Sequence, residues 1–250
     1  MEAQETNINV IANNLANVNT TGFKRSRANF QDLLYANARA VGSTASDDTE
    51  VPTGIQIGLG ARTAAVEKVY TVGDLEQTGS DLDLAIEGDG FFQILMPSGE
   101  TGYTRDGSLK KDSQGRLVTA DGKPLIPEIV IPENSTKVAI GKNGAVVSFM
   151  DNESLGTEIG AIELARFGNP SGLKSLGGNL VQESTASGAP MLGAPNSNGL
   201  GGIAQGYLEG SNVSIMKEMI DLIAGQRAYE VNSKAVKAAD EILQQINQLV

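Results

Sequence analysis

The side chains that usually carry catalytic or metal chemistry are scarce in this chain. Cysteine and histidine are both absent, which removes the common zinc ligands and the commonest general base. The segment Asp81 to Ile86 places large apolar residues where an EF-hand calcium loop needs oxygen ligands or its turn glycine. A serine nucleophile would lack a histidine base, and no Gly-x-Ser-x-Gly elbow occurs. We therefore predict no catalytic residues, no metal site and no cofactor.

The charge of the chain excludes further classes of partner. With 19 basic and 30 acidic side chains the formal net charge is −11, so its field repels nucleic-acid phosphates and anionic membranes. Some pair among 30 acidic residues could always be nominated as a glycosidase pair, so their number indicates nothing. We interpret the basic cluster Lys24, Arg25 and Arg27 as a solvated segment that follows a helix. No stretch approaches the roughly 18 apolar residues of a membrane span, and we expect no cleaved secretory signal.

Both ends of the chain have the apolar spacing of helices. Between Met1 and Val18 apolar residues from Ile8 onward alternate steps of three and four, which is typical of a coiled-coil seam. This helix is expected to stop near Asn19 to Gly22. From about Val213 to Val250 there is no proline and one glycine, and apolar residues recur every seven positions. A helix of ~35 residues would be about 50 Å long, which is long for a compact domain.

The middle of the chain reads as strands and tight turns. Alternating Leu82 to Ile86, the interruption Gly88 to Gly90 and the apolar run Phe91 to Met96 predict a hairpin. Further strands are expected at residues 129–131, 138–140 and 145–149, with Asp-Gly turns at 106–107 and 121–122. The small and turn-forming residues of 36–53 and 168–202 predict extended or loop-like connections.

The fold class that follows is a multi-part α+β chain. We expect the terminal helices to form a coiled-coil core domain and the middle to form an all-β domain. The predicted parts are an N-terminal helix and following segment at 1–35, an extended insertion at 36–65, an all-β outer domain with a Gly/Ser-rich return at 66–207, and a C-terminal helix at 208–250.

The helical stripes could be an internal helix pair, an inter-subunit seam or both. The C-terminal stripe is wider than one partner helix would cover, which favours contacts with other chains. The asparagines of the first helix (Asn7, Asn9, Asn13, Asn14, Asn17) either solvate its outer face or hydrogen-bond to neighbouring chains on assembly. The predicted assembly residues are Ile8, Ile11, Leu15, Val18, Tyr229, Ala235, Ala239, Ile242, Ile246 and Leu249.

Two long motifs carry a resemblance to a known family. The run from Ile11 to Lys24 resembles the N-terminal signature of flagellar rod and hook proteins, and the run from Gly225 to Asp240 resembles their C-terminal signature. Within the family, the segments Ser26 to Tyr35, Gly90 to Gln93 and Gly102 to Gly107 are most similar to the distal-rod members. The resemblance covers essentially the whole chain.

The resemblance implies a structural subunit of a stiff tube that crosses the periplasm in the flagellar basal body and transmits torque. Its implied partners are copies of itself, proximal rod proteins, the hook protein and surrounding ring proteins, and its implied export is by the flagellar type III apparatus. Family members usually have a further stretch ahead of the position of Met1, so we expect this chain to begin late in the first helix.

The resemblance also implies that residues 36–60 occupy an insertion that accompanies a straight, stiff tube. We hypothesise that this insertion wedges between neighbouring subunits. A proximal rod or hook subunit, or, in another class, a periplasmic polysaccharide hydrolase, are the alternative functions.

Overall fold

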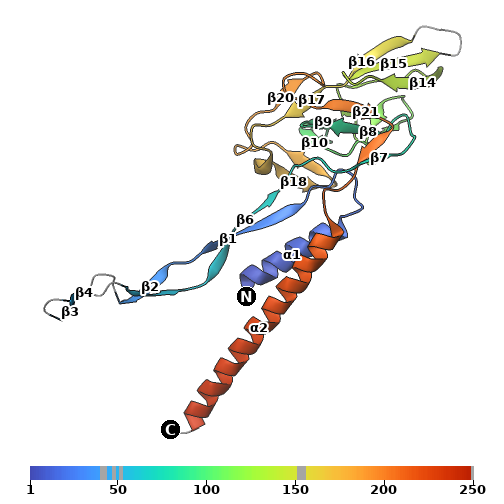
Figure 1. The fold of residues 1–250 in the computed structure, drawn as a ribbon. Helices are drawn as coiled ribbons and strands as arrows, with labels where there is room; N and C mark the ends of the chain where they lie inside the picture. Colours follow the sequence, from blue (N-terminus) through green and yellow to red (C-terminus); the bar gives the residue numbers. More distant parts are fainter. Residues whose placement is uncertain (40–43, 47–48, 51–52, 151–155, 249–250) are drawn as a thin grey trace. The chain divides into compact units, whose positions relative to one another are not determined.

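The computed structural model of the chain describes residues 1–39, 44–46, 49–50, 53–150 and 156–248 (Figure 1). The contacts divide the chain into two compact units. The terminal unit comprises residues 1–13, 26–67 and 216–250, and the β unit comprises residues 14–25 and 68–215. Within the described ranges, no helix is both long and apolar enough to cross a membrane.

Each end of the chain forms a helix, as the sequence predicts. Helix α1 spans Glu2–Ala16, and helix α2 spans Ile215–Gln248 and is 34 residues long. The turn that follows α1 closes at Gly22, whose φ of +67° suits glycine. In the terminal unit the helices meet at Gly225, where an added methyl group would lie 3.2 Å from Cγ1 of Ile8. Glycine therefore lets α1 approach the backbone of α2 closely.

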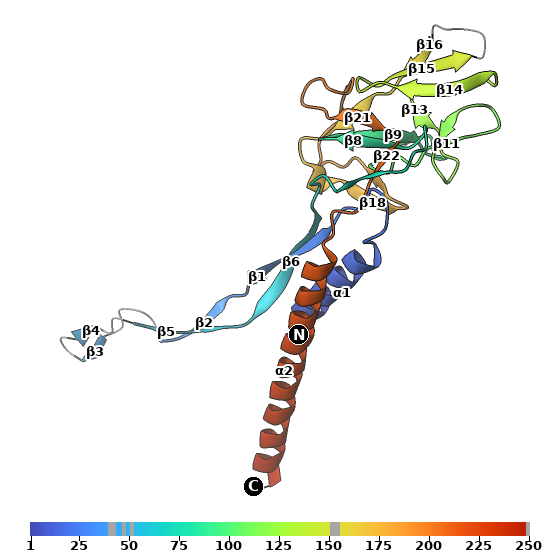
Figure 2. The same ribbon diagram turned by 45° about the vertical axis from the view of Figure 1, so that its right-hand side comes forward.

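The segment predicted as extended or loop-like before the β unit forms a β ribbon (Figure 2). Its strands are β1 Ser26–Asp32, β2 Tyr35–Arg39, β3 Thr44–Ser46, β4 Thr49–Glu50, β5 Ile55–Gly58 and β6 Ala61–Lys68. β1 pairs with β6, β2 with β5 and β3 with β4. Residues 35–38 and 55–58 are exposed on both faces of the ribbon, so the alternation that marks a half-buried strand is missing from their sequence. The parts of the predicted insertion at 40–43, 47–48 and 51–52 lie outside the described residues.

The β unit contains strands at most of the positions that the sequence predicts for the middle of the chain, in more pieces. They are β7 Leu75–Gln77, β8 Leu84–Glu87, β9 Phe91–Leu95, β10 Thr101–Thr104, β11 Lys110–Lys111, β12 Leu117–Val118, β13 Leu125–Ile126, β14 Ser135–Ile140, β15 Ala145–Met150, β16 Thr157–Ala161, β17 Leu164–Arg166, β18 Lys174–Gly177, β19 Leu180–Gln182, β20 Met191–Gly193, β21 Gly202–Gln205 and β22 Tyr207–Glu209. One sheet has seven strands in the order β18-β19-β10-β9-β17-β20, with β13 paired to β9. β14, β15 and β16 form a second sheet, and β8 pairs with β21, β7 with β22 and β11 with β12.

The predicted hairpin between Leu82 to Ile86 and Phe91 to Met96 is wrong. β8 pairs antiparallel with β21, whereas β9 pairs with β10. Leu84, Ala85 and Ile86 are all buried, so β8 is covered on both faces. The apparent alternation came from the small size of Ala85 and did not mark an exposed face.

Two further expectations for the β unit need correction. Residues 168–202, expected to be extended or loop-like connections, contain the paired strands β18, β19 and β20 and a short 3-10 helix at Pro170–Gly172. The turn between β18 and β19 has positive φ at Gly177, Gly178 and Asn179, so the glycines there join strands. The strand expected at 129–131 is absent from the described sheets, where Val130 makes only an isolated bridge to Arg116.

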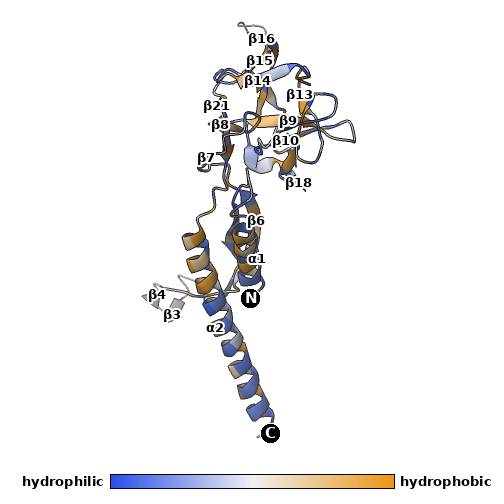
Figure 3. Cartoon of the chain, turned by 90° about the vertical axis from the view of Figure 1, so that its right-hand side faces the viewer, coloured by the Kyte–Doolittle hydropathy of each residue, from blue (hydrophilic) through white to orange (hydrophobic). Residues whose placement is uncertain are grey.

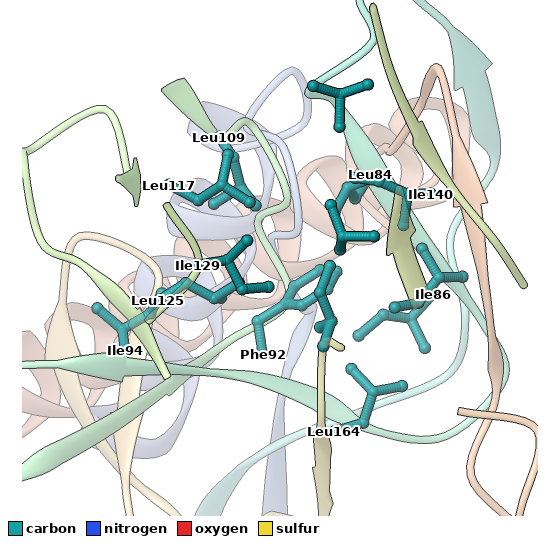
Figure 4. Packing of buried hydrophobic residues seen from close by; sticks show 14 of the residues in the cluster. Leu84, Ile86, Phe92, Ile94, Leu109, Leu117, Leu125, Ile129, Ile140 and Leu164 are labelled. Atoms are coloured by element: carbon teal, nitrogen blue, oxygen red, sulfur yellow. The ribbon is translucent and has the colours of Figure 1, made fainter. Parts of the chain in front are cut away.

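The hydrophobic core lies in the β unit. Its main cluster brings together residues such as Leu84, Ile86, Phe92, Ile94 and Leu164 (Figure 4). A smaller cluster gathers several of the few aromatic residues: the ring centroids of Tyr103 and Phe167 are 4.8 Å apart and those of Phe91 and Phe167 are 5.8 Å apart, both edge to face. The β unit thus holds a packed core within a single chain.

Candidate assembly surfaces and a buried ionic cluster

Helix α2 exposes an extended apolar surface. Figure 3 shows hydrophobic positions crowded along its first half and recurring among polar ones in its second half. The exposed fractions of Met216, Ile220 and Ile223 are 75%, 61% and 55%, and those of Val236 and Leu243 are 50% and 59%. Spacings of four, three and seven residues place such side chains on common faces of a helix. A surface of this kind is a candidate site of contact with another protein chain.

The predicted assembly residues fall into two groups in the structure. In the first group Ile11 is buried, and Ile8, Leu15 and Val18 are half-buried. In the second group Tyr229, Ala235, Ala239, Ile242 and Ile246 are all exposed, whereas Leu249 lies outside the described residues.

Within the terminal unit, the structure does not bring Ile8 and Ile11 against residues 235–246. The helices touch at Ile8 and Gly225, and Ile242 lies about 25 Å farther along α2 at 1.5 Å per residue. A seam that joins the first group to residues 235–246 therefore requires a second chain, and it stays a prediction.

The β ribbon of the terminal unit exposes a second apolar surface. Leu34 is 84% exposed, and Ile55, Ile57 and Leu59 on the opposing strand segment are each more than half exposed. Between β1 and β2, residues 31–35 and Arg62 line an open hollow of about 520 Å³. A two-stranded ribbon is marginally stable in water by itself, so this surface is also suited to contact with other chains.

A buried ionic cluster in the β unit was not predicted. Nζ of Lys24 lies 2.5 Å from Oε1 of Glu209, and Nη1 of Arg105 lies 3.3 Å from Oε2 of the same carboxylate. Lys24, Arg105 and Glu209 are 3%, 3% and 0% exposed. The interpretation of the Lys24 cluster as a solvated segment is therefore wrong for Lys24, because a carboxylate distant in sequence neutralises it.

Further hydrogen bonds make Glu209 a junction between three parts of the β unit. The backbone N–H of Gly73 donates to Oε1 of Glu209, and Gly22 N–H donates to its backbone carbonyl. The ammonium of Lys24 also donates to the carbonyl of Thr71 at 2.7 Å. Near this point the Asn212 side chain accepts from Arg25 N–H and donates to Val69 and Thr71. The segment that follows α1 and the segment that precedes α2 are thereby fixed side by side.

Burial and the neighbouring carboxylate shift the pKa values of Lys24 and Arg105 in opposite directions. Burial lowers the pKa of Lys24 below its usual value, and the charge of Glu209 and the hydrogen bond to it oppose this shift. Burial likewise lowers the pKa of Arg105, and the charge of Glu209 again opposes it. The carboxylate is thus the group that favours the charged forms of both side chains.

The asparagines of α1 do not all behave as solvated residues. Asn14 is fully buried, and Asn17 accepts a hydrogen bond from Thr20 Oγ1 at 3.3 Å. Asn9 and Asn13 are exposed. The solvated interpretation is therefore wrong for Asn14, and the prediction of hydrogen bonds to other chains is left to the exposed positions.

The acidic segment considered for calcium, Asp81 to Ile86, is a turn that leads into strand β8. Oδ2 of Asp83 accepts a hydrogen bond from Thr78, and the carbonyl of Asp81 accepts one from Gln205. In the part of the chain that the structure describes, no group of three or more acidic side chains is arranged to hold a metal ion.

Comparison with known proteins finds matches to flagellar rod and hook families along the chain. Residues 1–24 match the family described as flagella basal body rod protein, residues 85–148 match the flagellar hook protein FlgE/F/G D1 domain, and residues 204–249 match the flagellar basal body rod FlgEFG protein C-terminal family. The chain is 49% identical over 249 residues to the flagellar basal-body rod protein FlgG of Buchnera aphidicola subsp. Schizaphis graminum, with 100% of this chain and 96% of the relative covered. It is 48% identical to the FlgG protein of Agrobacterium fabrum, covering 97% and 93% of the two chains, and 39% identical to that of Bacillus subtilis, covering 98% and 94%.

The ionic cluster makes a prediction about stability. Replacing the carboxylate in Glu209→Gln leaves Lys24 and Arg105 facing each other without a counter-charge, so the free energy of unfolding of the β unit should fall by about 3–5 kcal/mol. Glu87→Gln makes the same chemical change in the exposed pair with Lys142 of the same unit, whose atoms are 3.5 Å apart, and should cost far less because solvent screens that pair. Urea unfolding followed by circular dichroism measures both losses. Equal losses would show that the buried cluster has no special role.

Proposed function

Because this chain belongs to the flagellar basal-body rod protein family, we propose that it is a structural subunit of the distal rod, a stiff tube that carries torque from motor to hook. The family is structural and not enzymatic. One observation carries the proposal: the apolar residues along α2 are exposed in the single chain. Such a helix is completed by packing against copies of the same chain.

The size of the α2 surface suits assembly. Complete burial of one large aliphatic side chain contributes about 1.5–3 kcal/mol, and Ile242 and Ile246 are 56% and 51% exposed. Each of them therefore retains about half of that contribution for contacts with another chain. Repetition of the contact along a polymer supports a stiff wall built from many moderate interactions.

The terminal helices are proposed to form the inner part of the tube and the β domain the outer part. The proposed division is 1–35 and 208–250 for the terminal core domain, 36–65 for the insertion and 66–207 for the outer domain. The proposed partners are copies of the chain, proximal rod proteins, the hook protein and ring proteins, and the proposed location is the rod in the periplasm. The net charge of −11 disfavours nucleic acid as a partner.

The β ribbon is proposed as a brace between neighbouring subunits. Its antiparallel β2 and β5 strands are stiffer than the single extended chain that the sequence indicated. Leu34, Ile57 and Leu59 are 84%, 57% and 64% exposed, so the ribbon has apolar side chains available for a neighbour. A brace of this kind would limit the sliding of subunits that bending requires, which distinguishes a distal rod from a hook subunit.

Charge introduced on the apolar face of α2 should prevent assembly. Ile242→Lys should raise the critical concentration for polymerisation more than about tenfold, which corresponds to a loss of about 1.4 kcal/mol per contact. Gln244→Lys is the matched control, because it adds the same charge two residues farther on, at an exposed position on the other side of the helix. Sedimentation and electron microscopy measure polymer, and circular dichroism checks that both monomers fold. An unchanged critical concentration for Ile242→Lys would contradict the proposed seam.

Shortening the ribbon should change the form of the tube. Arg39 at the end of β2 lies opposite Ile55 at the start of β5, so replacing Val41 to Gly54 with Asn-Gly leaves a three-residue loop that can close the hairpin. This variant should still polymerise through α2 but give curved tubes in electron micrographs. Straight tubes from the shortened chain would show that the ribbon does not set the shape and would favour another member of the rod and hook group.

A further inference from the structure

A small cavity in the β unit is lined by positive charge. It has a volume of about 20 Å³, and its lining includes Lys24, Lys68, Tyr70 and Arg105 together with the rings of Phe23 and Phe91. Among the described residues, no carboxylate lines it. The cavity therefore concentrates three cationic side chains in a chain whose formal net charge is −11.

The charges of the side chains that line this cavity, of which Lys24 and Arg105 are buried and Lys68 is half-buried, do not balance. Glu209 is fully buried and is already shared between Lys24 and Arg105. Lys68 has no carboxylate within ion-pair distance in the described structure, and its ammonium lies 6.0 Å from the ring centroid of Phe23. Uncompensated positive charge in a desolvated site is unfavourable. Binding of a negative ion would therefore stabilise this site.

Two hydrogen-bond donors at the cavity are also without partners. Nε of Arg105 and the hydroxyl of Tyr70 are both buried and make no hydrogen bond within the described ranges. Burial raises the pKa of Tyr70 to about 12, so the hydroxyl keeps its proton and can donate. An anion accepts from such donors without donating in return, which suits a lining made of cations and donors.

We propose that this cavity binds one small inorganic anion of the size of chloride. The volume of about 20 Å³ is close to the space that one water molecule requires, which is too little for phosphate, sulfate or an organic carboxylate. The anion would neutralise the excess charge beside the Lys24, Arg105 and Glu209 cluster. In this way it would stabilise the point where the segments next to α1 and α2 are held together.

Thermal unfolding of the dilute full-length chain tests this site. The midpoint is measured in sodium chloride and in sodium gluconate at the same ionic strength. Chloride at about ten times its dissociation constant should raise the midpoint of the wild-type chain by about 3–5 °C. Lys68→Met removes a cation and Tyr70→Phe removes a donor, and each should abolish most of this shift.

Lys142→Met is the matched control, because Lys142 is a 71% exposed cation in the same unit and its replacement should leave the shift unchanged. Equal wild-type midpoints in the two salts would overturn the proposal and assign the cavity to water. A wild-type chloride shift in both Lys68→Met and Tyr70→Phe would also overturn it, because the ion would then bind elsewhere.

Discussion

The structure depends on one constraint: a 34-residue helix has apolar residues along most of its length and little of its own chain to cover them. Residues 234–247 are all exposed, and α1 meets α2 much earlier, at Gly225. An isolated helix is only marginally stable in water, and tertiary packing usually supplies most of the stability of a helix in a protein. The second half of α2 therefore lacks that packing within the single chain, and we propose that other copies of the chain supply it.

The β unit is held together by contacts within one chain. Its core is complete in one chain, and Glu209 joins the segment after α1 to the segment before α2 through Lys24, Gly22 and Gly73. Buried ion pairs contribute little net stability, but loss of one partner is costly. The cluster therefore fixes which segments lie together within the β unit, namely the segment after α1 and the segment before α2.

Local sequence patterns predicted the helices and the β character of the middle of the chain. They could not predict which distant segments pair with each other. The spacing from Ile8 to Val18 and the heptad positions near Val236 are local, so they identified α1 and α2. Lys24 stands beside Arg25 and Arg27 in the sequence, and nothing near it indicates that its partner is Glu209. The hairpin predicted for β8 was wrong for the same reason, because its pairing partner β21 lies far along the chain. The ribbon was missed because strands exposed on both faces have no alternating pattern.

Hydrogen–deuterium exchange of the dilute monomer and of the assembled polymer tests the central claim most directly, because exchange reports local opening of each helix. The account predicts that amides of residues 230–248 exchange rapidly in the monomer and are strongly protected in the polymer, while the strands of the β core are protected in both. Protection of residues 230–248 in the dilute monomer would contradict it, because the helix would then be complete within one chain. Rapid exchange there in the polymer would contradict it as well, because the seam would lie elsewhere.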